Sequence, residues 1–419
     1  MSCSSSKKLD IEIESLKKEG SVYLQNNDTA NDLEVSNINN ILLYPLISQN
    51  KITWDYPFQN SENLIKNYQI NNNYKSFKTE NFYNYNSDNY YKKEILFTND
   101  KIIYVDDYAN LFILDTNFKL LKKIQLYEKK LFGDYLLKYS LIISNNTLFI
   151  SDNLGFIIAI NLNNYSILWK NNFTVPFLSN LVIYKDSIFV TNSNGKLYSF
   201  NVLNGVQNWS FETGTNNIKS DLAYKITISD NKLFFSNDMG DIYAVNVDDK
   251  GLIWNYKISQ NNYNNFNDLF KLANLTYQNN FLYFSSSFGN YFKLNAINGN
   301  LVWSSSGKSH INSILNPDSI ITISENTFLL IYEKKTGKIL YKKNIKKLLP
   351  DKKIEFNNIF LLANKIIITT NEGHFILIDS LDLKKISIKK VAKAIKSNII
   401  IYSDKIFFLG EKGFLYKIL

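Results

Sequence analysis

Residues that commonly carry chemistry are scarce in this chain of 419 residues, which has one Cys and two His. The single thiol, Cys3, allows neither an intramolecular disulfide nor a Cys-based metal site. His310 falls in a polar loop and His374 starts a predicted strand, so we expect both to be ordinary surface residues. No nucleophile–base pair, phosphate-binding Gly loop or H-E-x-x-H motif is visible. The sequence therefore predicts no catalytic, cofactor or metal site.

One chemical role remains for Cys3, which is attachment of lipid. The start MSCSSSKK resembles the mature end of a bacterial lipoprotein, where a diacylated Cys precedes a polar tether. The preceding apolar segment and most of the lipobox are missing, so the alternatives are a mis-assigned start, a clipped sequence or an ordinary Cys. Residues 1 to 40 are polar and lack a sustained period, which predicts a flexible tether with a lipid anchor at its start.

The formal charge of +9 comes entirely from Lys, since the chain contains no Arg. Asn, Lys, Ile, Tyr and Phe are residues that AT-rich codons supply, so part of this charge reflects codon usage. A basic balance attracts anionic lipid or an acidic partner surface. The lysines alternate with acids and form no nucleic-acid arm, so no nucleic-acid partner is expected. No apolar run reaches the ~18 residues that a membrane helix needs.

The elements that position these residues are set by a repeat. Four stretches begin with Gly, carry Asn six residues later and end with Trp fourteen residues later: Gly155 to Trp169, Gly195 to Trp209, Gly240 to Trp254 and Gly289 to Trp303. Around each stretch, short alternating apolar runs are separated by Asn-Gly or Asp-Ser turns, which predicts four strands joined by three hairpins. One such meander every 40 to 49 residues is the unit of a β-propeller. We expect the Trp on the outer strand to fill the wedge between blades.

Weaker copies extend the array to eight. They begin at Ala109, Thr327, Gly373 and Gly413, and the last ends six residues later, before a fourth strand. Residues 48–54 match the missing piece, because Gln49-Asn50 stands at the turn position and Trp54 follows at the repeat spacing. The sequence thus predicts an all-β, eight-bladed β-propeller over residues 41–419, closed by an N-terminal strand that completes the last blade. The Asn- and Tyr-rich stretch from Asn60 to Asn89 is expected to form a long loop and the first strand of blade one, with an aromatic, cationic partner surface as the alternative.

The repeat G-x-[IL]-Y-x-[LIF]-N-x-x-x-G-x-x-x-W resembles the PQQ-type propeller repeat. Within that group the chain resembles, over residues 41–419, the BamB-type lipoproteins of the outer-membrane β-barrel assembly machinery. These also have eight blades, a weak sixth, a seventh without the Trp and a chain that ends inside blade eight. The resemblance implies a non-catalytic scaffold, without cofactor, that is lipid-anchored on the periplasmic face of a Gram-negative outer membrane and assists insertion of outer-membrane proteins.

The resemblance also implies a docking site for the POTRA domains of the central barrel-assembly protein, with unfolded outer-membrane proteins as further partners. One contact loop precedes blade four and carries an apolar–basic pair, which Ile218 and Lys219 match. The second precedes blade five and is acidic in the family, whereas here Leu269 is followed by Lys271 and Ala273. This departure puts the second contact in doubt, or implies a partner whose charge has changed in a complementary way.

Two other functions stay open. A quinoprotein dehydrogenase shares the repeat, but such enzymes use a vicinal Cys pair and a carboxylate base, neither of which the sequence shows. Addition of a quinone with Ca²⁺ would test it by absorbance. The other alternative is a propeller that binds a different envelope protein or a glycan, which affinity capture in mild detergent would distinguish.

Overall fold

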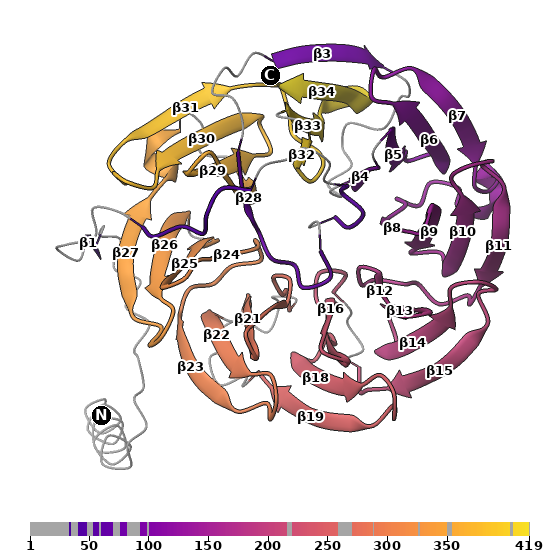
Figure 1. The fold of residues 1–419 in the computed structure, drawn as a ribbon, viewed down its shortest axis with the longest axis horizontal. Helices are drawn as coiled ribbons and strands as arrows, with labels where there is room; N and C mark the ends of the chain where they lie inside the picture. The colour runs from indigo at the N-terminus through magenta and orange to yellow at the C-terminus, as the bar shows by residue number, and fades with distance from the viewer. Residues whose placement is uncertain are drawn as a thin grey trace, which may run out of the picture. The chain divides into compact units, whose positions relative to one another are not determined.

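The computed structural model describes residues 33–34, 41–47, 53–57, 60–69, 76–81, 93–98, 100–215, 220–258, 270–287, 289–325, 327–349, 354–402 and 405–418. Of these, 33–34 and 76–81 are described by their backbone. The described strands form eight sheets arranged as the blades of a ring, which confirms the eight-bladed propeller (Figure 1). All pairs of these strands are antiparallel except β2 (Asn67–Tyr68) with β28 (Phe356–Leu362), which is parallel. Of the expected tether over residues 1 to 40, only Leu33–Glu34 is described, and it pairs as a strand with blade 6; Cys3 lies outside the described residues.

The first four blades each have four strands in simple meander order. From the inner to the outer strand, they are β4 (Ile95–Phe97), β5 (Lys101–Val105), β6 (Asn110–Asp115) and β7 (Leu120–Gln125) in blade 1; β8 (Tyr139–Ser144), β9 (Thr147–Asp152), β10 (Phe156–Asn161) and β11 (Ile167–Asn172) in blade 2; β12 (Val182–Tyr184), β13 (Ser187–Thr191), β14 (Lys196–Asn201) and β15 (Gln207–Glu212) in blade 3; and β16 (Ile226–Ser229), β17 (Lys232–Ser236), β18 (Asp241–Asn246) and β19 (Leu252–Lys257) in blade 4.

The last four blades include three added N-terminal strands. The strands are β20 (Thr276–Gln278), β21 (Phe281–Ser285), β22 (Asn290–Asn295) and β23 (Leu301–Ser306) in blade 5; β24 (Ile314–Leu315), β25 (Ser319–Ile323), β26 (Phe328–Glu333), β27 (Ile339–Asn344) and the added β1 (Leu33–Glu34) in blade 6; β28 (Phe356–Leu362), β29 (Lys365–Thr370), β30 (His374–Asp379), β31 (Ile386–Lys390) and the added β2 (Asn67–Tyr68) in blade 7; and β32 (Ile400–Tyr402), β33 (Lys405–Leu409), β34 (Phe414–Ile418) and the added β3 (Ser76–Asn81) in blade 8.

Blade 8 is completed by β3, which pairs antiparallel with β34 and lies outside it in Figure 1. Closure by an N-terminal strand is thus confirmed, but the assignment of residues 48–54 to that strand is wrong. The backbone of Trp54 instead pairs with Phe97 in the inner strand of blade 1. The physical reason is that adding a strand to a sheet edge requires only free backbone N–H and C=O groups. The Asn–Trp spacing of the blade repeat is therefore not required in the closing strand.

The stretch from Asn60 to Asn89 does not provide the first strand of blade 1 either, because that strand is β4. Described residues 41–47, 53–57 and 60–69, which we call the strap, instead cross the centre of the ring in indigo (Figure 1). The strap bonds seven blades directly: Trp54 N–H to Phe97 O at 2.7 Å, Ile143 N–H to Asp55 O at 2.9 Å, Tyr56 OH to Ile183 O at 3.4 Å, Thr227 OH to Ser61 O at 2.6 Å, Tyr277 N–H to Glu62 O at 3.2 Å, Ala363 N–H to Tyr68 O at 2.7 Å and Asn398 Nδ2–H to Pro57 O at 3.1 Å.

The remaining blade, blade 6, is reached by packing, since Leu64 contacts the apolar cluster that contains Leu315. Most of the strap's contacts lie at the C-terminal ends of the inner strands, where the two-residue hairpins to the second strands begin. The strap therefore covers that end of the central channel. The loops that join one blade to the next leave from the opposite face.

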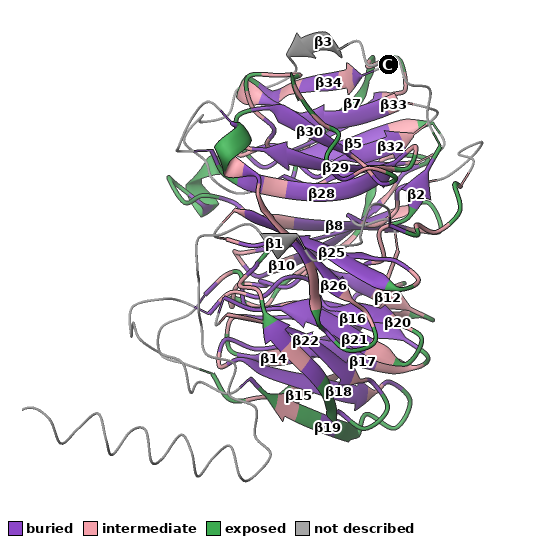
Figure 2. Cartoon of the chain, turned by 90° about the vertical axis from the view of Figure 1, so that its left-hand side faces the viewer, coloured by how far each residue is buried: buried purple, intermediate pink, exposed green. Residues whose placement is uncertain are grey.

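The core lies between the blades rather than in one central mass. One cluster joins Phe234 and Trp254 of blade 4 to Phe284 and Phe292 of blade 5. Inner and middle strands are almost entirely buried, whereas the outer strands alternate between exposed and partly buried residues (Figure 2). Each blade thus buries its faces only against its neighbours, as expected of a repeat protein.

The repeated Trp fills the wedge between blades, as predicted. The Trp254 indole N–H donates to Ala296 O at 3.1 Å in the next blade. Its ring lies against Gly299, which has φ +75°, and a Cβ added there would come within 2.6 Å of the ring. Trp169 and Trp303 contact Gly205 and Gly337 of their following blades in the same way. The Gly in the turn between the third and fourth strands is therefore the place where the Trp of the preceding blade packs.

Turns between the second and third strands use a common side-chain acceptor. Asp152 Oδ1 accepts from the N–H groups of Leu154 and Phe156 at 2.9 and 3.0 Å. Asn192 and Asn237 do the same in blades 3 and 4. Asp152 is buried and also accepts from the Tyr127 hydroxyl at 2.6 Å. Burial raises its pKa from 3.8 to about 6.

This pKa predicts an effect of pH on stability. The folded protein binds a proton at Asp152 more tightly than the unfolded chain, so this stabilising contribution is complete below pH ~4 and is lost as pH rises through about 6. Asp152→Asn should keep the turn, because Asn occupies the position in two other blades. In the unaltered protein the free energy of unfolding should fall by about 2–3 kcal/mol between pH 4 and 6, and this fall should be absent in Asp152→Asn. Denaturant unfolding at both pH values measures this.

The control is Asp248→Asn, which alters an exposed ion pair with Lys185 and should leave the decrease in place. An unchanged decrease in Asp152→Asn would contradict the assignment of the pH effect to Asp152.

Candidate functional site

The loops expected to bind a partner are the connections before blades 4 and 5. Both leave the ring on the face opposite the strap, because they run from an outer strand to the next inner strand. Ile218, Lys219 and Leu269 lie outside the described residues. The described parts of the two loops are residues 213–215 with 220–225, and residue 258 with 270–275.

The structure brings these two loops together. Leu272 N–H donates to Leu222 O at 3.1 Å, which joins the connection before blade 5 to the one before blade 4. Lys271 and Ser287 are tied by Lys271 N–H to Ser287 Oγ and by Ser287 N–H to Lys271 O, both at 2.9 Å. Phe270 is buried beneath the loop. The backbone that carries Lys271 is therefore held on two sides.

Two residues of this surface were missed by the sequence reasoning, Asp221 and Leu222. Leu222 is 37% exposed. Asp221 O accepts from the Lys138 ammonium at 3.1 Å, which links the site to the connection between blades 1 and 2. Burial lowers the pKa of Lys138, and the negative charges of Asp221 and Glu94 partly oppose that shift. In the sequence, only the position of Asp221, two residues after Lys219, could have indicated that it belongs to this surface.

This distribution puts an acidic side chain in the first loop and a basic one in the second. That Lys271 and Ala273 stand where the resemblance implies acidic residues stays a prediction. An exposed Leu222 beside the partly exposed Asp221 and Lys271, on firmly held loops, suits reversible recognition of another surface. They provide no arrangement of a nucleophile with a base.

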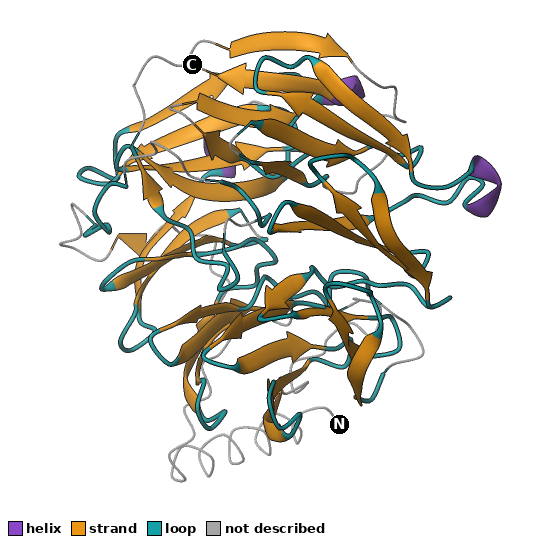
Figure 3. Cartoon of the chain, turned by 45° about the vertical axis from the view of Figure 1, so that its right-hand side comes forward, coloured by secondary structure: helices purple, strands orange, loops and turns teal. Residues whose placement is uncertain are grey.

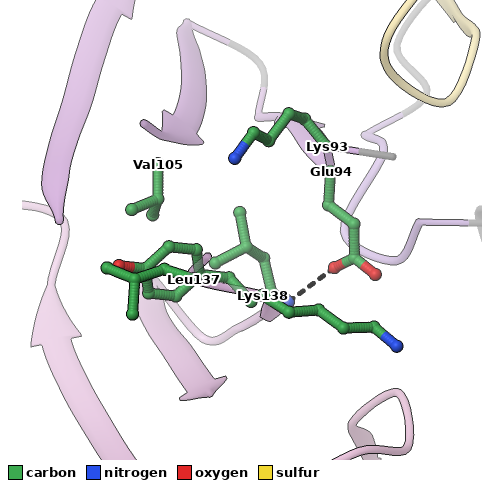
Figure 4. Close-up of a pocket in the computed structure, with 7 residues that line it drawn as sticks. Lys93, Glu94, Val105, Leu137 and Lys138 are labelled. Atoms are coloured by element: carbon green, nitrogen blue, oxygen red, sulfur yellow. Dashed lines mark hydrogen bonds between the residues drawn. The ribbon is translucent and has the colours of Figure 1, made fainter. Parts of the chain in front are cut away.

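Between blades 1 and 2 lies a narrow cleft lined by Lys93, Glu94, Val105, Leu137, Lys138, Tyr139 and Leu141. Glu94 accepts a hydrogen bond from Leu141 N–H at 2.7 Å, while the amino groups of Lys93 and Lys138 point away from each other (Figure 4). Lys93 pairs with Asp107, and burial lowers the pKa of Lys93 to about 8. The cleft has room for about one water molecule, so it does not accommodate a quinone.

The two histidines lie apart, in blades 5–6 and 7. His310 is exposed, and its Nδ1 is 3.1 Å from Glu325 Oε1. His374 is buried rather than on the surface, which corrects the prediction, because its ring packs into the turn with Nδ1 3.2 Å from Thr370 Oγ1. Burial lowers its pKa. Within the described ranges, no three His, Cys, Asp or Glu side chains gather as a metal-binding group, and no helix is long and apolar enough to span a membrane.

Comparison with known proteins supports the architecture and the family. Residues 138–343 match the family described as outer membrane protein assembly factor BamB, a span of just under half of the chain. The match begins at blade 2 and ends in blade 6, so it includes both candidate loops. No protein of curated function matches the sequence significantly.

Several solved structures share the fold at low sequence identity. BamB from Moraxella catarrhalis has a TM-score of 0.66 at 13% identity, covering 82% of this chain and 98% of that protein. A quinohemoprotein alcohol dehydrogenase from Pseudomonas putida gives 0.65 at 8% identity, with coverage of 88% and 80%. The computationally designed protein Ika8 gives 0.59 at 9% identity, with coverage of 79% and 96%. The likeness to both an outer membrane protein assembly factor and an alcohol dehydrogenase shows that the fold alone does not decide function. Together with the family match over residues 138–343, the shared fold shows that the chain is similar to β-propellers of the BamB type.

Proposed function

We propose that this protein is a non-catalytic scaffold subunit of the outer-membrane β-barrel assembly machinery. It docks on the POTRA region of the central barrel-assembly protein and assists insertion of outer-membrane proteins. The observation that carries the proposal is the family match over residues 138–343, which spans both candidate loops. The contact residues are Ile218, Lys219, Leu269 and Lys271, with Asp221 and Leu222 beside them.

The held geometry of the two loops supports a docking role. Their mutual hydrogen bond and the Lys271–Ser287 pair fix the described backbone before a partner arrives. Little loop entropy is then lost on binding, which favours affinity from a small surface. In this proposal, acylation of Cys3 holds the protein on the periplasmic face of the outer membrane. Unfolded outer-membrane proteins are further partners.

Crosslinking from single positions tests this function. A photo-crosslinking residue at position 219 or 271, in the native envelope, should capture the central barrel-assembly protein, with the crosslinked peptide in a POTRA domain by mass spectrometry. Position 203 is the matched control, because Leu203 is 80% exposed on the strap face. Capture of the same protein at equal yield from position 203, or of a different envelope protein or a glycan from position 219, would overturn the proposed docking.

A quinoprotein dehydrogenase is the second candidate, favoured by the structural similarity to the alcohol dehydrogenase. Its test is addition of pyrroloquinoline quinone and Ca²⁺ to the purified chain. Saturable spectral change with dye-linked alcohol oxidation would support the enzyme. An absorbance change that rises linearly with quinone concentration, without saturation and without turnover, would exclude the enzyme and leave the scaffold role as the proposed function.

A further inference from the structure

Two helical turns with the same sequence, Lys-Lys-Leu, project from the ring. The first, η1 (Lys129–Leu131), lies between β7 and β8, and the second, η2 (Lys346–Leu348), lies between β27 and β28. Leu131 is 53% exposed and Leu348 is 41% exposed. Figure 3 shows η1 extending beyond the strands of its blade. Each turn thus presents an aliphatic side chain directly beside two ammonium groups.

Both turns lie on the face opposite the strap. The connection to η1 starts with Leu126 N–H bonded to Ala109 O, and η2 is preceded by Ile345 N–H bonded to Thr327 O. In each case the acceptor lies in the turn between the second and third strands, so both connections leave at that end of the blade. Backbone hydrogen bonds continue along this face from the connection before blade 7 to the start of blade 1: Asn371 N–H to Glu355 O, Ile395 N–H to Asn371 O, Lys396 N–H to Leu409 O and Lys93 N–H to Lys396 O.

Positive charge is concentrated in the same sector of the ring. The outer strands of the meanders in blades 1, 6 and 7 each contain two adjacent lysines: Lys122 and Lys123, Lys342 and Lys343, and Lys389 and Lys390. In blade 6 the added β1 pairs with β27 on its outer side. The outer strands of blades 2 to 5 contain no such pair; β11 and β19 have one Lys each, and β15 and β23 have none. The excess of Lys is therefore unevenly placed, which creates a directional field.

The surroundings of η1 add apolar surface. Tyr135 and Leu136 follow it and are 77% and 44% exposed. The acids nearby are Glu128, which pairs with Lys130 at 2.6 Å, and Asp134. The exposed aliphatic side chains stand at the tips of convex turns rather than in a groove. Such tips enter a fluid interface more easily than they fit a second folded protein, which would need matching pockets.

We propose that this sector, comprising η1, η2 and the lysine-rich outer strands of blades 1, 6 and 7, binds the surface of a membrane that contains anionic phospholipid. Lysine ammonium groups are compact charges that attract headgroup phosphates without a fixed geometry. Leu131 and Leu348 add a short insertion into the interface. This inference does not depend on the barrel-assembly role, since it uses only the charge and exposure of the ring.

Vesicle co-sedimentation of the unacylated full chain tests the proposal without any partner protein. Binding to phosphatidylcholine vesicles containing about one third phosphatidylglycerol should exceed binding to pure phosphatidylcholine by at least about tenfold, and should weaken with salt. The double variant K129E/K347E should lose about tenfold of that binding. The control K185E/K250E, which reverses two lysines near the strap face in blades 3 and 4, should stay within about twofold.

A second variant separates insertion from charge alone. L131S/L348S leaves every charge in place and should still reduce binding several-fold, because the apolar contribution is lost. Equal binding to both vesicle types, binding to neither, or an unchanged K129E/K347E variant would overturn the proposal. Undiminished binding of L131S/L348S would refute the insertion. Selective capture of an acidic protein, without vesicle binding, would assign the sector to that partner instead.

Discussion

Replacing Trp54 by alanine should destabilise the ring by about 3–5 kcal/mol, the range seen when a buried Trp is truncated. Trp54 is 6% exposed, stacks at a tilt against Tyr68 with ring centroids 5.8 Å apart, and donates its indole N–H to Pro57 O. Its removal leaves a cavity where the strap meets blades 1 and 8. The denaturant midpoint of the first unfolding transition measures the loss, and limited proteolysis should show faster cleavage within residues 41–69.

Leu203→Ala is the control for this experiment. Leu203 is 80% exposed on the same side of the ring, so its truncation should change stability by less than about 0.5 kcal/mol. If the two variants unfold at the same denaturant concentration, the strap does not contribute to the stability of the propeller.

Gly299→Ala should cost about 2–4 kcal/mol, from a left-handed backbone and from overpacking together. Gly299 has φ +75°, and its new Cβ would lie 2.6 Å from the Trp254 ring. The ring is held by its hydrogen bond to Ala296 O and cannot move away freely. Calorimetry or denaturant unfolding measures the decrease.

Gly133→Ala separates the two causes of this decrease. Gly133 also has positive φ, +54°, but a Cβ there meets nothing within 4 Å. It should cost about 1 kcal/mol or less. Equal losses at positions 299 and 133 would mean that contact with Trp254 contributes nothing and that backbone strain explains the whole effect.

Features that recur could be predicted from the sequence, because each copy supports the others. The number of blades, their strands and the packing of Trp254 on the next blade all follow from one spacing. Features that occur once were not predictable. The segment containing Trp54 imitates the repeat spacing but packs inside the ring, and β3 closes the last blade with residues that carry no repeat signal. His374 was misplaced because burial in a turn depends on its three-dimensional neighbours.

The candidate site shows the same limit. Position relative to the blades located the loops at Ile218 and Leu269, but the hydrogen bond between Leu222 and Leu272 depends on how two non-repeating loops meet. Asp221, an acid in the first loop, was not among the residues that the sequence indicated. The Lys-Lys-Leu turns are only three residues long, and their common face becomes evident only once the blades are arranged.

The strap has a consequence for the order of biosynthesis. Its residues leave the ribosome before any blade, yet their partners extend as far as Asn398 and Ala363. The strap can pair with blades 1 and 2 early, but its contacts to Ala363 and Asn398 must wait until almost the whole polypeptide has been made. Long delays between a segment and its partners slow maturation and leave sticky intermediates, which would make this protein dependent on chaperones during its assembly.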